Sequence, residues 1–481
     1  MTTAGGRRAF LGHSRQWMVP VLLFVLALPA ITPRLYASDE VGYFANLRSL
    51  WFDHDVSFDN EYRYFYDRGI ATAWTFYESY LVRETATGLR YSYWTVGPAI
   101  LWSPFYAVAD VTTRVRRAFG SEVPADGYSR PYLRAVTLGS AFYGFLAICI
   151  AIVTARRLVG AAHPAGLAIW LGTPLLHYMY IAPGFSHACG AFAAALFVAV
   201  WLRVRETWSL GGLMGLGAVC ALMVMVREQA VFFVVGPAID YIWSVAGAAR
   251  AADWARVRTL ALRVTAGAAV SLLCYSPQLL IYQTLYGQLT TPYTLDDRML
   301  WHAPHFFDVL FHPNHGFFFW TPLALVAVGG LAWFTWSGDG RGDVRARRIG
   351  ICLLAMFASQ AYIAGSILRW ELSGTYGQRR FIGTTIILVI GLATLFKLAQ
   401  RPVWRRAVAA VATVGVIWNV GLMAQYGAQL MDRGRVELAR NAYTTAFVLP
   451  RVLPSLAYRY LFDRRSFYLD PERYDEPSGT P

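Results

Sequence analysis

Long apolar stretches separated by short polar segments run through most of the chain. Eleven of them have about the 20 residues that an α-helix needs to cross a bilayer. They lie near residues 17–35, 135–155, 164–182, 187–202, 210–226, 230–247, 264–285, 316–336, 349–367, 381–398 and 405–424. The pattern predicts an all-α polytopic membrane protein with about eleven transmembrane helices.

A twelfth apolar stretch, residues 95–113, decides the topology. It carries Pro98, Pro104 and Asp110, and if it spans, five basic clusters face outward against the positive-inside rule. If it lies in the outer interface, all five fall in the cytoplasm. The clusters are Arg156/Arg157, Arg203/Arg205, Arg250/Arg256/Arg258/Arg263, Arg341/Arg345/Arg347/Arg348 and Lys397/Arg401/Arg405/Arg406. We therefore place residues 95–113 on the membrane surface.

This topology puts the N-terminus in the cytoplasm and most unusual polar segments outside. The outer segments are a long first loop (36–131), residues 183–187, 227–229, 286–315 and 368–380, and the tail 425–481. Residues 1–424 form the membrane domain, and we interpret the tail as a small extracytoplasmic appendage. The first apolar stretch is expected to be a retained anchor, because no small-residue cleavage site follows it.

Composition supports the membrane class and narrows the partners. Of 481 residues, 56% are hydrophobic and only 15% are charged, too few to cover a soluble domain. The net charge of +14 comes from short clusters between apolar stretches, so nucleic acid is not an expected partner. Lys397 is the only lysine beside 42 arginines, a bias typical of a GC-rich genome, which favours a bacterial cytoplasmic membrane. The five cysteines fall at apolar stretches and are expected to be core residues.

The first outer loop begins with acids and an amphipathic segment. In residues 40–51, Phe44, Leu47 and Trp51 share one side at helical spacing, which predicts a helix lying in the interface with its rings at headgroup level. The acids at 53, 55, 59 and 61 are interpreted as a solvated loop, since no calcium-loop glycine accompanies them.

Asp39 and Glu40 follow the first span by a few residues. A carboxylate at this point could act as a general base, taking a proton from an acceptor hydroxyl. It could also hold a divalent cation such as Mg²⁺ or Mn²⁺, so the cofactor stays open. The alternative is simple solvation of the start of the loop.

Residues 369–381, RWELSGTYGQRRF, keep arginines on the outer face against the positive-inside tendency. Arg369, Arg379 and Arg380 are candidates for binding a lipid phosphate, because guanidinium groups bind phosphate in bidentate fashion. Tyr376 could stack on a sugar or an isoprenoid unit. The alternative is that the arginines only reach toward headgroups.

Histidines gather at the outer ends of spans and in the loop 286–315. Those that could bind substrate hydroxyls or shuttle protons are His177, His187, His302 and His315, with satisfied interfacial histidines as the alternative. Their spacing resembles a zinc site only loosely, so no metal ligand is assigned. In the turn 227–229, Arg227 could bind phosphate or pair with Glu228. Asp296, Asp297 and Arg298 add candidate polar contacts.

As a pattern, the chain resembles the integral-membrane GT-C glycosyltransferases, which include protein O-mannosyltransferases, lipid A aminoarabinose transferases and oligosaccharyltransferase catalytic subunits. The resemblance rests on the acidic pair in SDEVGY after the first span, on the long first outer loop, and on four motifs. These motifs are VGPAILWSPF (96–105), GTPLLHYMY (172–180), HPNHGFFFWTPL (312–323) and WELSGTYGQRRF (370–381). It covers most of residues 15–425.

The resemblance implies a function at the outer face. Such enzymes move a sugar from a polyprenyl-phosphate donor to a glycan, lipid or protein acceptor, usually with inversion. Asp39 would be the base, Glu40 its neighbour, and Arg379 and Arg380 would bind the lipid phosphate. Several members carry a second acid after the third span, where this chain has histidines, which weakens a metal-dependent mechanism. A transporter or lipid-linked sugar flippase is the alternative function, and a non-catalytic scaffold in envelope assembly is a third.

Overall fold

The computed structural model describes residues 4–71, 73–160, 162–295, 297–337, 344–371 and 374–467. Arg341, Asp296 and residues 468–481 of the tail therefore lie outside the described residues. The α-helices are α1 (Ala4–Ala27), α2 (Ser38–Arg48), α3 (Asp59–Asp67), α4 (Trp74–Phe76), α5 (Gly97–Ala118), α6 (Arg130–Val159), α7 (His163–Leu171), α8 (Leu175–Tyr180), α9 (His187–Val204), α10 (Leu210–Val226), α11 (Val235–Arg250), α12 (Trp254–Tyr286), α13 (Pro292–Leu295), α14 (Asp308–Phe311), α15 (Phe317–Trp320), α16 (Pro322–Ser337), α17 (Val344–Ser366), α18 (Thr385–Leu398), α19 (Pro402–Gly427), α20 (Leu438–Tyr443) and α21 (Leu449–Phe462). The 3₁₀ and π segments are η1 (Leu28–Ala30), η2 (Ser49–Asp53), η3 (Tyr77–Val82), η4 (Glu228–Val234), η5 (Arg379–Thr384), η6 (Thr444–Val448) and η7 (Arg464–Phe467).

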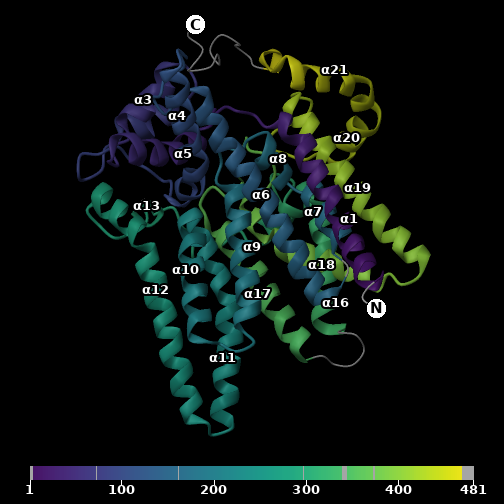
Figure 1. Cartoon of the computed structure of the whole chain (residues 1–481). Helices are drawn as coiled ribbons and strands as arrows, with labels where there is room; N and C mark the ends of the chain where they lie inside the picture. The colour runs from purple at the N-terminus through teal and green to yellow at the C-terminus, as the bar shows by residue number, and fades with distance from the viewer. Residues whose placement is uncertain are drawn as a thin grey trace.

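Long apolar helices form one bundle, as the sequence predicts (Figure 1). Among the described residues, seven helices are long and apolar enough to cross a membrane, and three shorter apolar segments accompany them. The three are 16–30, 210–226 and 322–336. The only β-type backbone pairings among the described residues are two isolated bridges. The chain is a multi-pass, all-α membrane protein.

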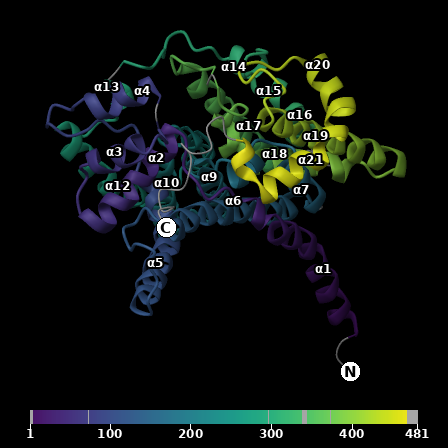
Figure 2. The same cartoon turned by 90° about the horizontal axis from the view of Figure 1, so that it is seen from above.

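Helix α5 projects from the edge of the bundle, an orientation compatible with its predicted place on the membrane surface (Figure 2). It has 22 residues, yet it does not qualify as an apolar span. Figure 2 looks down on the molecule and shows α5 side-on, projecting from the edge of the bundle. Val108, Val111, Val115 and Phe119 recur every three or four residues along it and are exposed, a stripe that suits a membrane interface.

The third predicted span is broken, which the sequence analysis did not foresee. Helix α7 ends at Leu171 and α8 begins at Leu175, because Pro174 has no N–H and disfavours helical geometry in the residue before it. The Nδ2 of Asn419 donates to the carbonyls of Leu171 (2.8 Å) and Thr173 (3.0 Å). The side chain from α19 thus satisfies carbonyls that the break leaves without helical partners.

Two expectations for the first loop were wrong. Phe44 and Leu47 do not face headgroups: they are 0% and 3% exposed, and Phe44 packs edge-on against Phe65 of α3. Glu61 is not a solvated loop acid, because it is fully buried and pairs with Arg48 at 2.9 Å. The loop packs its aromatic side chains over α2 and shares one hydrophobic core with the bundle, so protein takes the place that we assigned to lipid.

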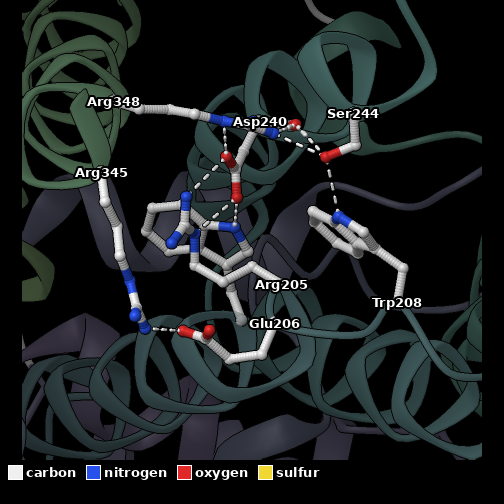
Figure 3. A network of polar contacts seen from close by, with 8 residues as sticks. Arg205, Glu206, Trp208, Asp240, Ser244, Arg345 and Arg348 are labelled. Atoms are coloured by element: carbon white, nitrogen blue, oxygen red, sulfur yellow. Dashed lines mark hydrogen bonds and ion pairs between the residues drawn. The ribbon is translucent and has the colours of Figure 1, made fainter. Parts of the chain in front are cut away.

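A buried ion cluster joins three helices at the end of the bundle away from this loop (Figure 3). Asp240 of α11 is fully buried and accepts from Arg205, just after α9, at 2.8 and 3.0 Å. Arg348 of α17 pairs with the same carboxylate, and Trp201 donates to it at 3.1 Å. With all its acceptor capacity used, Asp240 fixes the spacing of α9, α11 and α17.

The C-terminal segment returns to the beginning of the chain. Helix α21 lies across the ends of α1 and α19 (Figure 1), and Tyr460 donates from its hydroxyl to the carbonyl of Ala30 at 2.6 Å. Arg464 donates to the carbonyl of Ile31 at 2.9 Å. These contacts dock the described part of the tail on the membrane domain.

Candidate functional site

Segments far apart in the sequence meet around a cavity of about 370 Å³ at the end of the bundle that carries the first loop. Arg298, named from the sequence as a candidate polar contact, lines it, and so do four of the proposed site residues: Asp39, Arg227, Arg379 and Arg380. These four come from α2, from the turn before η4, and from the start of η5. The predicted outer segments 36–131, 227–229, 286–315 and 368–380 all contribute to the wall.

Asp39 stands at the edge of this cavity with one firm partner. Its Oδ2 lies 2.8 Å from Nη2 of Arg379, and its Oδ1 accepts from Nε1 of Trp94 at 3.3 Å. The Asp39 side chain stays 36% exposed, so its carboxylate can reach a ligand. A Cβ on Gly42 would come within 1.9 Å of the Trp94 ring, so the missing side chain lets Trp94 lie against α2 and hold Asp39.

The arginines are held by neutral groups and by Asp39. Arg227 donates to Oγ of Ser186 (3.0 Å) and Oε1 of Gln229 (3.2 Å), in place of the ion pair with Glu228 that was the alternative. The Nη1 of Arg379 is buried and has no hydrogen-bond partner among the described residues. Arg380 donates to backbone carbonyls, including that of Trp370 at 3.3 Å. Buried cations with neutral partners are arranged to receive an anion.

The cavity is positive overall. Its lining residues include four arginines, with Arg298 as the fourth, and two carboxylates, Asp39 and Glu228. Glu228 does not offset the arginines directly, because its Oε1 accepts from the hydroxyl of Tyr282 and its Oε2 accepts from that of Thr291 at 2.7 Å. This arrangement ties the turn 227–229 to the loop that follows α12.

One side of the cavity is apolar. Val231 and Phe232 of η4 line it together with Ile363 of α17 and Ile367, and Trp301 stacks on Phe232 with ring centroids 6.3 Å apart. Val231 is 44% exposed at this edge. A polar cavity with an apolar side at the level of the spans suits an amphiphile, with its charged group among the arginines.

Glu40 has a different place from its neighbour. It is fully buried and does not line the cavity. Its Oε2 accepts from the backbone N–H of Tyr36 (3.0 Å) and Ala37 (3.1 Å), and its Oε1 accepts from that of Gly184 (3.1 Å). Burial raises the pKa of Glu40 to about 8 against these hydrogen bonds. The side chain therefore caps α2 and joins it to the segment before α9.

Apart from Arg298, the other predicted site residues do not line this cavity. His187 is buried against Tyr178 and Phe185, and Tyr376 donates to the backbone and side chain of Asn419 at 2.8 Å. His315 is buried and stacks on Trp320, and its burial lowers its pKa to about 4. His302 and Arg369 are exposed. His177 stacks on Tyr376 and faces a second cavity.

Sequence reasoning missed the aromatic wall. The missed residues are Tyr43, Tyr80, Tyr93, Trp94 and Tyr293. Most sit in the first loop, in stretches rich in tyrosine such as RYSYW before α5. That enrichment was the available signal, since clustered aromatic rings beside polar groups are typical of sites that stack on ligands.

Metal ligands are not gathered here. Within the described ranges, no three side chains of His, Cys, Asp or Glu form a group that could hold a metal ion. The divalent cation left open by the sequence thus finds no fitting ligand set there, and no chemical step is derived through it.

Comparison with known proteins bears on the fold. No protein-family model matches the chain, and no curated protein does. Among solved structures, it is similar to ArnT from Cupriavidus metallidurans bound to undecaprenyl phosphate, with 15% identity, a TM-score of 0.50, and coverage of 99% of this chain and 76% of that one. It is also similar to the apo state of ArnT, with 15% identity, a TM-score of 0.49, and 97% and 75% coverage. ArnT is a GT-C glycosyltransferase, so the chain has the GT-C fold that the sequence resemblance implied.

Proposed function

We propose that the chain is a membrane glycosyltransferase that takes a sugar from a polyprenyl-phosphate donor, with the Asp39 cavity as its active site. The observation that carries the proposal is the pair of Asp39 with Arg379 in a cavity lined by four arginines. The ArnT structure contains undecaprenyl phosphate, which makes this donor class the natural first candidate.

The arginines account for the donor phosphate. Nη1 of Arg379 has no described partner, and Arg227 has neutral partners, so a phosphate can bind both without displacing a carboxylate other than Asp39. The isoprenoid chain would leave between Phe232 and Ile363. Cations that face the leaving phosphate stabilise the charge that develops on it in the transition state.

Asp39 accounts for the acceptor. An acceptor hydroxyl oxygen bonds to the anomeric carbon while the bond from that carbon to the phosphate oxygen breaks. Asp39 takes the hydroxyl proton, and the polyprenyl phosphate leaves with the electron pair. This single displacement inverts the anomeric centre, and it needs Asp39 ionised and near the attacking oxygen.

Glu40 fits a positioning role better than a catalytic one. A base must reach its substrate, whereas the Glu40 carboxylate is enclosed and bonded to three backbone N–H groups. Its raised pKa also favours the protonated form at neutral pH, which cannot accept a proton. Glu40 instead holds the turn that presents Asp39.

The test uses the purified protein in liposomes with a panel of polyprenyl phosphates that carry radiolabelled sugars. Transfer predicts label leaving the donor lipid and an inverted product. A flippase, the alternative, would move labelled donor between leaflets with the sugar still attached. Movement of the labelled donor across the bilayer, with no label released from any donor, would contradict the proposed glycosyltransferase activity.

A further inference from the structure

A second and larger cavity, of about 590 Å³, lies beside the active-site turn and under the C-terminal helix α21. Its walls are the end of α1, the start of α6, the short helix α8, the end of α19, and α21. Apolar side chains dominate it, among them Leu133, Leu176, Val420, Met423, Leu453 and Leu456. Because the walls are ends of apolar spans, the cavity lies at the depth of one bilayer leaflet.

The polar part of this cavity is basic. Among its described lining residues are four arginines and no aspartate or glutamate, the arginines being Arg34, Arg130, Arg433 and Arg464. The guanidinium of Arg433 lies 4.6 Å from the ring centroid of Tyr426. An apolar interior with an arginine rim complements a lipid whose headgroup is anionic.

Two buried polar groups in the wall of this cavity have no hydrogen-bond partner among the described residues. His177 and Tyr180 of α8 are each 3% exposed and line the cavity. Nδ1 of His177 and the hydroxyl of Tyr180 have no hydrogen-bond partner among the described residues. Buried polar groups are normally satisfied, so their position points to a polar ligand group entering from the cavity.

A single turn separates this cavity from the active site. Tyr36 lines the second cavity and Asp39 lines the first, while Glu40 binds the backbone N–H of Tyr36 from the same turn. Because Tyr36 and Asp39 are three residues apart along the chain, the distance between a headgroup held at Tyr36 and the proposed base is limited.

We infer that the second cavity binds the acceptor, and that the acceptor is an anionic lipid with a free hydroxyl. This rests on the proposed function: the hydroxyl oxygen attacks the anomeric carbon, its proton goes to Asp39, and polyprenyl phosphate leaves from the first cavity. The lipid chain fills the space between α19 and α21, and the arginines hold the anionic group.

The test is photolabelling of the full-length protein in nanodiscs of zwitterionic lipid. The probe is phosphatidylglycerol with a diazirine in its acyl chain, and its control is phosphatidylcholine with the same chain. We expect phosphatidylglycerol to label peptides of α8, α19 and α21. Ala457→Trp on α21 and Met423→Trp on α19, which fill the cavity from two helices, should abolish that labelling, while Ser455→Trp on α21, outside the cavity lining, should not. Arg433→Gln should weaken competition by unlabelled phosphatidylglycerol by about tenfold.

Two results would overturn the inference. Equal labelling by phosphatidylcholine would mean that bilayer chains alone enter the cavity, and labelling unaffected by both tryptophans would place the lipid elsewhere. Binding of labelled undecaprenyl phosphate, measured in the same variants, separates this from the proposed function. If Ala457→Trp still binds the donor and is still labelled by phosphatidylglycerol, only the acceptor site is contradicted. If the wild-type protein binds no donor, the proposed function is contradicted.

Discussion

Asp39 and Asp240 are both paired with arginine, but one borders a cavity and the other is enclosed on every side (Figure 3). Asp240 is 0% exposed, and its carboxylate oxygens are bonded by two arginines and a tryptophan, which leaves no acceptor position for a ligand. The Asp39 side chain is 36% exposed, and its arginine keeps one buried nitrogen without a described partner. Burial and ion pairing alone therefore do not distinguish the proposed active site from a structural ion cluster. The difference is the donor of Arg379 that has no partner among the described residues and lies beside accessible space.

The largest effect on stability is expected at Asp240, and a catalytic role for this residue would contradict the contrast with Asp39. Asp240→Asn leaves Arg205 and Arg348 without their counter-ion, and loss of one partner of a buried pair costs about 3–5 kcal/mol. We expect a lower unfolding temperature in detergent, with transfer per folded molecule retained. Ser244→Ala, which removes neutral hydrogen bonds to Arg348, to Trp208 and to the backbone carbonyl of Asp240 but no charge, is the milder control. A stable Asp240→Asn protein that no longer transfers sugar would contradict the structural role.

A substitution of Arg379 tests whether the cavity at Asp39 is the active site. Arg379→Gln removes the cation beside Asp39, and loss of one preorganised group facing a developing charge costs about 10²- to 10³-fold in kcat. Arg369→Gln is the matched control, because Arg369 is exposed and outside the cavity. Equal loss in both variants would mean that the charge of the segment, and not the cavity, sets the rate.

Glu40 sharpens the distinction between a base and a cap. Its folded-state pKa is raised, so the folded protein holds the proton more tightly than the unfolded chain does, and stability falls as pH rises from about 4.5 to about 8. Glu40→Gln cannot ionise, so this part of the pH dependence should disappear. Thermal unfolding from pH 5 to 8.5 measures it; a variant whose profile parallels wild type would disprove the assignment.

The smallest effect is expected at His302, which the sequence proposed for substrate binding. It is exposed and absent from the cavity wall, whereas its neighbour Trp301 lines it. His302→Ala should leave kcat and KM essentially unchanged, since its exposed side chain lies outside the cavity, while Trp301→Ala should raise the donor KM. A large loss in His302→Ala would show that the loop moves to bring it into the site.

The sequence predicted the bundle because apolar length carries that information directly. It missed the break in the third span, since the carbonyls freed beside Pro174 are bonded by the side-chain amide of Asn419, which is more than 240 residues away along the chain. It pointed to Asp39, Arg227, Arg379 and Arg380, which line the cavity, because an acidic residue soon after the first span and arginines on the outer face, against the positive-inside tendency, stand out in the sequence. It could not separate Asp39 from Glu40, because the partners that distinguish these neighbours, Arg379 for Asp39 and Gly184 for Glu40, lie far away along the chain.

The most direct test of the central claim compares wild type, Asp39→Asn and Asp240→Asn at equal amounts of folded protein. Initial rates of sugar release from the polyprenyl-phosphate donor and unfolding temperatures are measured on the same samples. The account predicts that Asp39→Asn loses about 10²- to 10⁴-fold in rate with its unfolding temperature unchanged, and that Asp240→Asn shows the reverse. An Asp39→Asn protein that transfers at the wild-type rate would contradict it.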